Sequence, residues 1–294
     1  MRARLISAMA AASLLAVGGA VGSSAAARQA ASHGFFRSRC LYSHTLPDDP
    51  ILMPKMPGES MVHDFFGNAT TDAGSTAAAL RAAPATSCLA PADTSAYWMP
   101  ALYQHGVRIV PRLLLAYYRT AGRPAASIRT IPQGLQMIAG NETAMSPQST
   151  RIAYWDCGAK AIVPHTALPP ASCPAGSTLV LSLVFPDCWD GHTLAGAGQR
   201  NVVYATRQGC PAGHPVAIPE LVVHVHYPIS RGDGLTLSMG PTANTMPGSI
   251  YTAHADFINA WDPSVLSSLV SACDVASVRC GTVGPLDRPL GVEQ

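Results

Sequence analysis

The eight cysteines are the strongest constraint on how this chain can fold. An even number of cysteines in an exported protein is typical of a disulfide framework. The chain has no C-x-x-C motif, which argues against a zinc knuckle or a redox pair. Spacing alone leaves the connectivity open. Pairing of neighbours along the chain is the simplest hypothesis, and it gives Cys40–Cys88, Cys157–Cys173, Cys188–Cys210 and Cys273–Cys280.

Residues 1–27 have the pattern of a secretory signal peptide. Arg2 and Arg4 form a positive start, residues 5–21 are uncharged, small and apolar, and residues 25–27 offer an A-x-A cleavage site. An N-terminal membrane anchor is the alternative, but the apolar run is short and rich in Gly and Ala. We therefore expect a secreted, extracellular protein with one β-rich domain over residues 28–280 and a flexible tail over 281–294.

Composition excludes several classes of partner and chemistry. Charged residues make up 12% of the chain and hydrophobic residues 48%, which does not fit a disordered protein. Without Arg2 and Arg4, 17 basic residues balance 17 acidic ones, so the mature chain lacks the charge to attract nucleic acid or a membrane surface. We find no G-x-S-x-G, H-E-x-x-H, P-loop or dinucleotide motif, and we expect a monomer with no cofactor.

Short apolar runs between Pro and Gly turns predict a mainly β fold. We expect a disulfide-stapled, β-sandwich-like single domain with one or two short helices, long loops and an irregular N-terminal third. Helices are predicted over 75–83, with Ser75 as the N-cap, and after Asp262-Pro263. The predicted strands cover residues 108–110, 113–118, 178–185, 201–206, 217–218, 221–227 and 235–239.

Three clusters mix ionisable and aromatic side chains. The first contains His63 and Asp64, whose side chains point apart if the chain is extended there. In the second, Trp189 and Asp190 could bind a sugar, or Trp189 could pack against a disulfide.

In the third cluster, residues 254–262, His254 and Asp256 share one side of an extended chain and could share a proton, a metal or a ligand. Asp262 is better explained as a helix cap. We predict that the ionisable groups of all three clusters line one concave surface, because such groups are costly to bury unpaired. A separate pair, His224 and His226, has spacing suited to a metal on one strand face, but a solvent-facing pair explains it better.

The order of several motifs resembles the secreted family called domain of unknown function 1996, found in fungi and actinobacteria. The resemblance spans roughly residues 36–274 and implies secretion, sometimes beside carbohydrate-binding modules, but no particular activity. The matching runs are 40–44, 48–51, 63–68, 75–76, 80–81, 95–103, 134–140, 185–191, 210–211, 214–219 and 254–262.

The chain departs from the family pattern at two polar sites. The pattern has a histidine two residues before the one that matches His63, and this chain has Met61 there. A D-H-x-S-H-like run is replaced by residues 198–201, which end in Asn201. If those histidines carry the family's chemistry, the resemblance implies that this chain only binds.

These features favour a secreted protein that acts on or binds extracellular or cell-wall polysaccharide. As an enzyme it would be a glycoside hydrolase with a carboxylate pair drawn from Asp64, Asp190 and Asp256, oriented by His63 and His254. As a binding module it would use its aromatic and polar groups, namely Trp98, Trp189, Trp261 and His214. We assign no metal ligands, although a metal site drawn from His44, His63, His214 and His254 is a third hypothesis.

Overall fold

A computed structural model describes residues 33–158, 165–195 and 200–291. Contacts divide the chain into Met1–Ala30 and Ala31–Gln294, and the described residues all belong to the second unit. The expected signal peptide, residues 1–27, lies outside the described residues. None of the described helices is long and apolar enough to cross a membrane.

One large sheet dominates the described residues. Its longest strand, β1 (Phe35–Leu46), joins two halves of the sheet, one that continues through β6 and one that continues through β2. Residues 35–41 of β1 pair with β6, and residues 42–46 pair with β2, with a register shift between Tyr42 and His44. The strands follow the order β7 (Gln136–Gly140), β15 (His254–Ile258), β3 (Ala96–Pro100), β2 (His63–Gly67), β1, β6 (Leu113–Arg119), β13 (Glu220–His226), β9 (Val180–Val184) and β8 (Ala153–Asp156), while β16 (Arg279–Thr282) pairs with β1.

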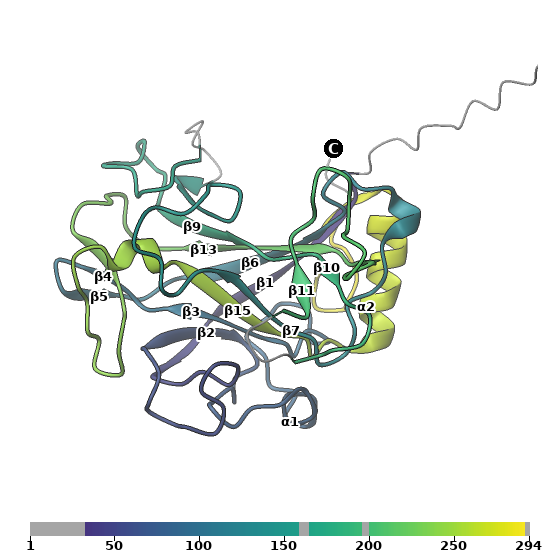
Figure 1. The fold of residues 1–294 in the computed structure, drawn as a ribbon, viewed down its shortest axis with the longest axis horizontal. Helices are drawn as coiled ribbons and strands as arrows, with labels where there is room; N and C mark the ends of the chain where they lie inside the picture. The colour runs from purple at the N-terminus through teal and green to yellow at the C-terminus, as the bar shows by residue number, and fades with distance from the viewer. Residues whose placement is uncertain (1–32, 159–164, 196–199, 292–294) are drawn as a thin grey trace, which may run out of the picture. The chain divides into compact units, whose positions relative to one another are not determined.

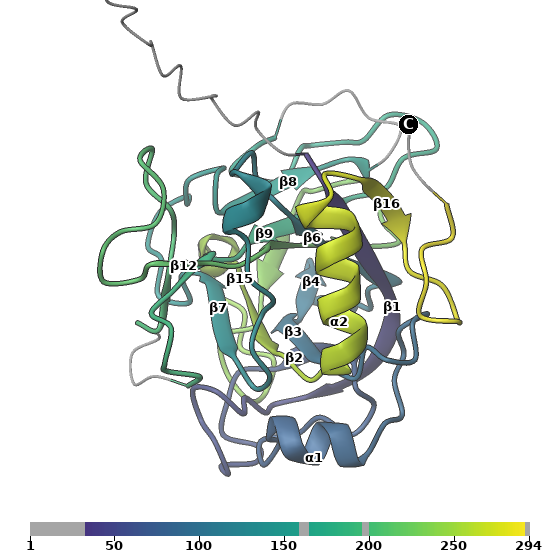
Figure 2. The ribbon, with the colours of Figure 1, turned by 90° about the vertical axis from the view of Figure 1, so that its right-hand side faces the viewer.

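The two halves of this sheet face each other across the main hydrophobic core (Figure 1). Tyr97 of β3 and Tyr118 of β6 meet across it with their hydroxyl oxygens 2.5 Å apart. Helix α2 (Pro263–Leu269) lies at one end of the strands (Figures 1 and 2) and adds Leu266 and Leu269 to the core. A mainly β fold with few short helices, as predicted, is confirmed.

A second, smaller apolar cluster lies on the outer face of the β2–β3–β15 half. It contains Phe65, Trp98 and Ile258, and it is covered by Leu80 of helix α1 (Ala77–Ala82). Both faces of β2, β3 and β15 are therefore buried. The remaining elements are β4 (Leu102–Gln104), β5 (Val107–Ile109), β10 (Cys188–Trp189), β11 (Val202–Val203), β12 (Val216–Ala217), β14 (Leu235–Leu237), η1 (Ala125–Ser127), η3 (Ser249–Thr252) and η4 (Val270–Val275).

All four disulfides predicted by pairing neighbouring cysteines are present, and no cysteine is free. The helix after Asp262 is also confirmed, with the Asp262 carboxylate accepting from the N–H groups of Ser264 and Val265. The N-cap of α1 is Thr76 instead of Ser75, because the Thr76 hydroxyl accepts from Ala79 N–H.

The prediction of an irregular N-terminal third was wrong, since β1, β2 and β3 lie there. The expected flexible tail begins inside β16. Val283 N–H donates to Arg37 O, and Leu290 N–H donates to Thr282 O, so this part of the tail is hydrogen-bonded to the domain.

Candidate metal centre

Strand β2 separates the side chains of His63 and Asp64, as the extended geometry predicts. Asp64 points toward the main core, where it meets Thr45 and Arg108. His63 points to the outer face, where its ring lies 6.4 Å from that of Phe65. The two side chains therefore belong to different environments.

On that outer face His63 meets His254 and Asp256, which come from a distant part of the sequence. Strand β3 lies between β2 and β15 (Figure 1), and His63 is the register partner of Pro100. Asp256 is the register partner of Trp98, and the same register continued by two residues places His254 on the other side of Pro100. The two imidazoles thus approach each other across Pro100 of β3.

The ligand-type atoms of the three side chains form a close cluster. His63 Nε2 lies 3.5 Å from His254 Nε2, and His254 Nε2 lies 3.8 Å from Asp256 Oδ2. All three residues have no exposed surface. One such atom from each residue lies within 4.8 Å of the others.

Backbone carbonyls fix the orientation of both imidazoles. His63 Nδ1 lies 3.0 Å from Asp48 O, and His254 Nδ1 lies 2.8 Å from Thr252 O. A carbonyl oxygen only accepts, so each Nδ1 carries the proton, and in the neutral ring each Nε2 then presents a lone pair. Gly140 lets the backbone of β7 lie close to Ala253 and His254, since a Cβ on Gly140 (φ +86°) would lie 2.3 Å from Ala253 O.

Burial keeps both imidazoles neutral. It lowers the pKa of His63 to about 4, against the hydrogen bond to Asp48. Burial also lowers the pKa of His254 to about 4, helped by the charge of His63. For Asp256, burial raises the pKa well above its ordinary value, and the nearby acids Asp49 and Glu142 add to this rise.

Neither hydrogen bonding nor a salt bridge explains the cluster. Both carboxylate oxygens of Asp256 lack a hydrogen-bond partner among the described residues. The 3.8 Å separation from His254 is too long for a hydrogen bond. Two ligands bound tetrahedrally to Zn²⁺ lie about 3.3–3.6 Å apart, which is close to the observed separations. Two neutral imidazoles and one carboxylate are also a common donor set for divalent transition metals.

Sequence reasoning missed the acidic neighbour Asp49. It is 1% exposed, and its Oδ1 accepts from the N–H groups of Ile51 and Leu52. Asp49 acts electrostatically on both His254 and Asp256. The Asp48-Asp49 pair is visible in the sequence, but nothing there shows that it lies close to His63, His254 and Asp256.

The three carboxylates considered for hydrolysis are not brought together. Asp64 and Asp256 leave opposite faces of the sheet half. Burial raises the pKa of Asp64 to about 6, opposed by the charge of Arg108 and hydrogen bonds from Thr45 and Arg108. Asp190 closes a turn, because its Oδ1 accepts from the N–H groups of His192 and Thr193. Burial acts to raise the pKa of Asp190, but these hydrogen bonds lower it to about 2.

The expected aromatic platforms are mostly covered. Trp98 is 1% exposed and Trp261 0%, so no sugar ring can stack on either, and these two expectations need correction. Their rings pack in the two hydrophobic clusters. Trp189 is half-buried, and its Nε1 donates to Thr193 O, 2.7 Å away.

The other histidines stay outside the cluster. His44 bonds Ser43 and Thr71 O and stacks on Phe65, while His214 bonds Arg200 O. His224 and His226 share the outer face of β13, and His224 Nδ1 lies 2.7 Å from Ser182 Oγ. His63, His254 and Asp256 therefore gather, but they are fully buried and line no concave surface, contrary to the prediction. Asp64 and the Trp189-Asp190 pair lie apart from them.

Fold and site together define a mainly β, disulfide-linked protein with a buried His-His-Asp cluster. The chain belongs to the family described as Domain of unknown function (DUF1996), whose model matches residues 49–261. The resemblance stated from the motifs is thereby confirmed. Comparison with the curated proteins gave no match, and neither did comparison with the solved structures.

Proposed function

We propose that this is a secreted protein that binds one divalent transition-metal ion through His63, His254 and Asp256. The observation that carries the proposal is the buried Asp256 carboxylate, which has no hydrogen-bond partner among the described residues and lies beside two lone-pair-bearing Nε2 atoms. A cation would compensate the carboxylate charge and use both lone pairs.

The metal ion would join β2 and β15, two strands that are far apart in the sequence. His63 is the first residue of β2, and His254 is the first residue of β15. The backbone carbonyl of Asp48 accepts a hydrogen bond from His63 Nδ1 and so orients its ring. These carbonyl contacts are the kind of second-shell support that metal-binding histidines use. Because the ligands have no exposed surface, we propose a structural role for the ion, out of reach of a polysaccharide chain.

Secretion is part of the same proposal. It is supported by the signal-peptide pattern of residues 1–27 and by four disulfides, which persist in oxidising compartments. Expression with the native leader, followed by N-terminal sequencing of protein from the medium, tests it. Intact leader on cell-associated protein would contradict secretion.

The metal is tested on the purified, oxidised protein. Elemental analysis should find about one Zn, Fe, Mn, Co or Ni per chain, or the chelator-treated protein should take up one Zn²⁺ in calorimetry. His254→Asn and His63→Asn should each lower Zn²⁺ affinity by at least about tenfold. His214→Asn is the matched control, since His214 lies outside the cluster. No metal uptake, or equal uptake by all three variants, would refute the site.

A further inference from the structure

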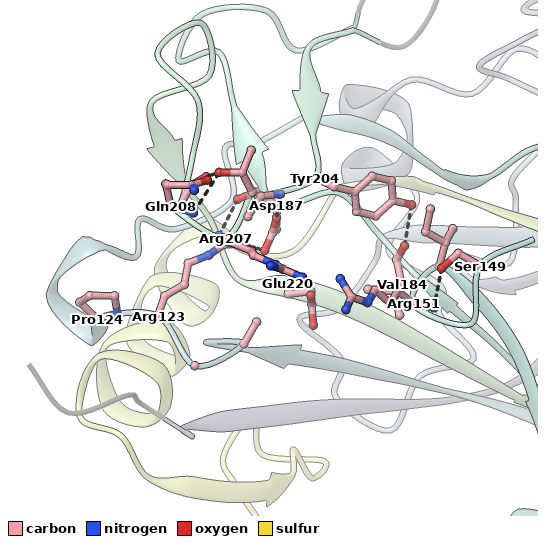
Figure 3. Close-up of a pocket in the computed structure, with 16 residues that line it drawn as sticks. Arg123, Pro124, Ser149, Arg151, Val184, Asp187, Tyr204, Arg207, Gln208 and Glu220 are labelled. Carbon is pink, nitrogen blue, oxygen red and sulfur yellow. Dashed lines mark hydrogen bonds and ion pairs between the residues drawn. The ribbon is translucent and has the colours of Figure 1, made fainter. Parts of the chain in front are cut away.

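A pocket of about 600 Å³ lies away from the metal cluster, where β6 ends and β13 begins. This is within the usual size of small-molecule sites. It is bordered by the turn after β6, the turn before β8, the loop after β11 and the start of β13 (Figure 3). The polar side chains that matter here are Arg123, Arg151, Asp187, Tyr204, Arg207 and Glu220.

The pocket has surplus positive charge. Arg123 forms an ion pair with the buried Asp187, and its Nη1 also donates to Asp187 O. Glu220 is paired with Arg119, with Oε1 2.6 Å from Arg119 Nε. Arg151 and Arg207 are exposed and have no ion pair within the described parts of the chain. Two guanidinium groups are therefore left to face a ligand.

The surroundings of these two arginines are held in place. Tyr204 donates its hydroxyl proton to Val184 O, 2.8 Å away, which fixes an exposed aromatic ring in the pocket wall. The loop that carries Arg207 is closed by two hydrogen bonds between Thr206 and Gly209. The next residue, Cys210, is tied to Cys188. Such preorganisation lowers the entropy that binding costs.

We propose that this pocket binds a uronic acid unit of an acidic polysaccharide. A uronate carries a planar carboxylate, which suits bidentate binding by guanidinium groups. Its pyranose ring has an apolar C–H face that can pack on the ring of Tyr204. The site is separate from the metal cluster and does not depend on it.

The test measures binding of oligogalacturonate and of a neutral galactan oligomer of equal length by calorimetry. Oligogalacturonate should bind, its affinity should fall with added salt, and the neutral oligomer should bind at least tenfold more weakly. Arg151→Gln and Arg207→Gln should each weaken binding by about tenfold, and the double variant by more. Arg112→Gln, which removes the charge of an exposed arginine outside the pocket, is the matched control.

Three outcomes would overturn the proposal. One is equal binding of the acidic and neutral oligomers. Another is unchanged binding in the Arg151→Gln, Arg207→Gln variant. A third is tighter binding of inorganic phosphate or a sulfated glycan than of uronate, which would make this a site for another oxyanion. His254→Asn should bind oligogalacturonate as the parent does, so failure here is distinguishable from failure of the metal proposal.

Discussion

His63 and Asp64 are adjacent in β2, yet one faces His254 on the outer side of the sheet and the other faces Arg108 on the inner side. Both are fully buried. Their surroundings differ, because Arg108 supplies a cation to Asp64, while no described residue supplies one to the His63 cluster.

Asp256→Asn should change the melting temperature in opposite directions with and without metal. The substitution replaces a buried carboxyl with a neutral group of the same shape, so the metal-free variant should melt at or above the parent temperature. Added Zn²⁺ should raise the melting temperature of the parent and not that of the variant. Thermal unfolding followed by circular dichroism, with Zn²⁺ or with chelator, measures both effects. A variant that melts lower by the same amount in both conditions would indicate packing alone.

Removal of Arg108 should be costly because it leaves the Asp64 carboxylate buried without a cation. Arg108→Met should lower the free energy of unfolding by about 3 kcal/mol. The double variant Asp64→Asn, Arg108→Met should recover most of the lost free energy of unfolding. Urea unfolding of the four proteins at pH 7 completes the cycle. If the two single effects simply add, the pair is not coupled. Zn²⁺ uptake should be unchanged in all four.

The buried Asp93 should make stability depend on pH. Burial raises the pKa of Asp93 from 3.8 to about 6, against hydrogen bonds from Ser38, Tyr97 and Ser95. Between these two values the unfolded chain releases this proton and the folded chain keeps it, so the free energy of unfolding falls as pH rises. The loss is on the order of 3 kcal/mol and is complete above about pH 6.

Asp93→Asn should remove this contribution. Relative to the parent, the variant should therefore gain stability between pH 4 and pH 6.5 in urea unfolding. Glu59→Gln, which removes a carboxylate at an exposed position, is the matched control. Parallel pH profiles for the parent and Asp93→Asn would mean that Asp93 does not titrate there.

The disulfide Cys40–Cys88 should contribute strongly to stability because it ties the middle of β1 to the segment before β3. The double variant Cys40→Ala, Cys88→Ala should lose about 2–5 kcal/mol of unfolding free energy. Non-reducing peptide mapping of the parent should recover the four neighbouring pairs and no free thiol. A mapped peptide that joins Cys40 to any other cysteine would contradict this connectivity.

Much of the β6–β13–β9 half could be predicted because its strands are apolar runs between turn residues. Leu221 to Val225 show the pattern well, and β13 covers Glu220–His226. The helix after Asp262-Pro263 was predictable because its capping is local. The disulfides were predictable because each joins cysteines that are neighbours in sequence.

The β2–β3–β15 half was not predictable from pattern alone. Each of these strands is buried on both faces, so apolar and polar residues do not alternate along them. Ionisable residues also lie within these strands, namely His63 and Asp64 in β2 and Asp256 in β15, so the strands do not read as continuous apolar runs. The meeting of His63 with His254 depends on the order of three strands and on a shared register at Pro100, and neither is encoded locally.

The position of β1 sets the order in which the molecule can be completed. Its first residues pair with Arg279 and Gly281 of β16, so the first strand to be synthesised needs the last one beside it. The edge of residues 35–37 that faces β16 therefore stays unpaired until residues 279–282 have been made. In the secreted protein that we propose, this delay would be useful, because a sheet that cannot close early leaves the chain unfolded enough to cross a membrane during translocation.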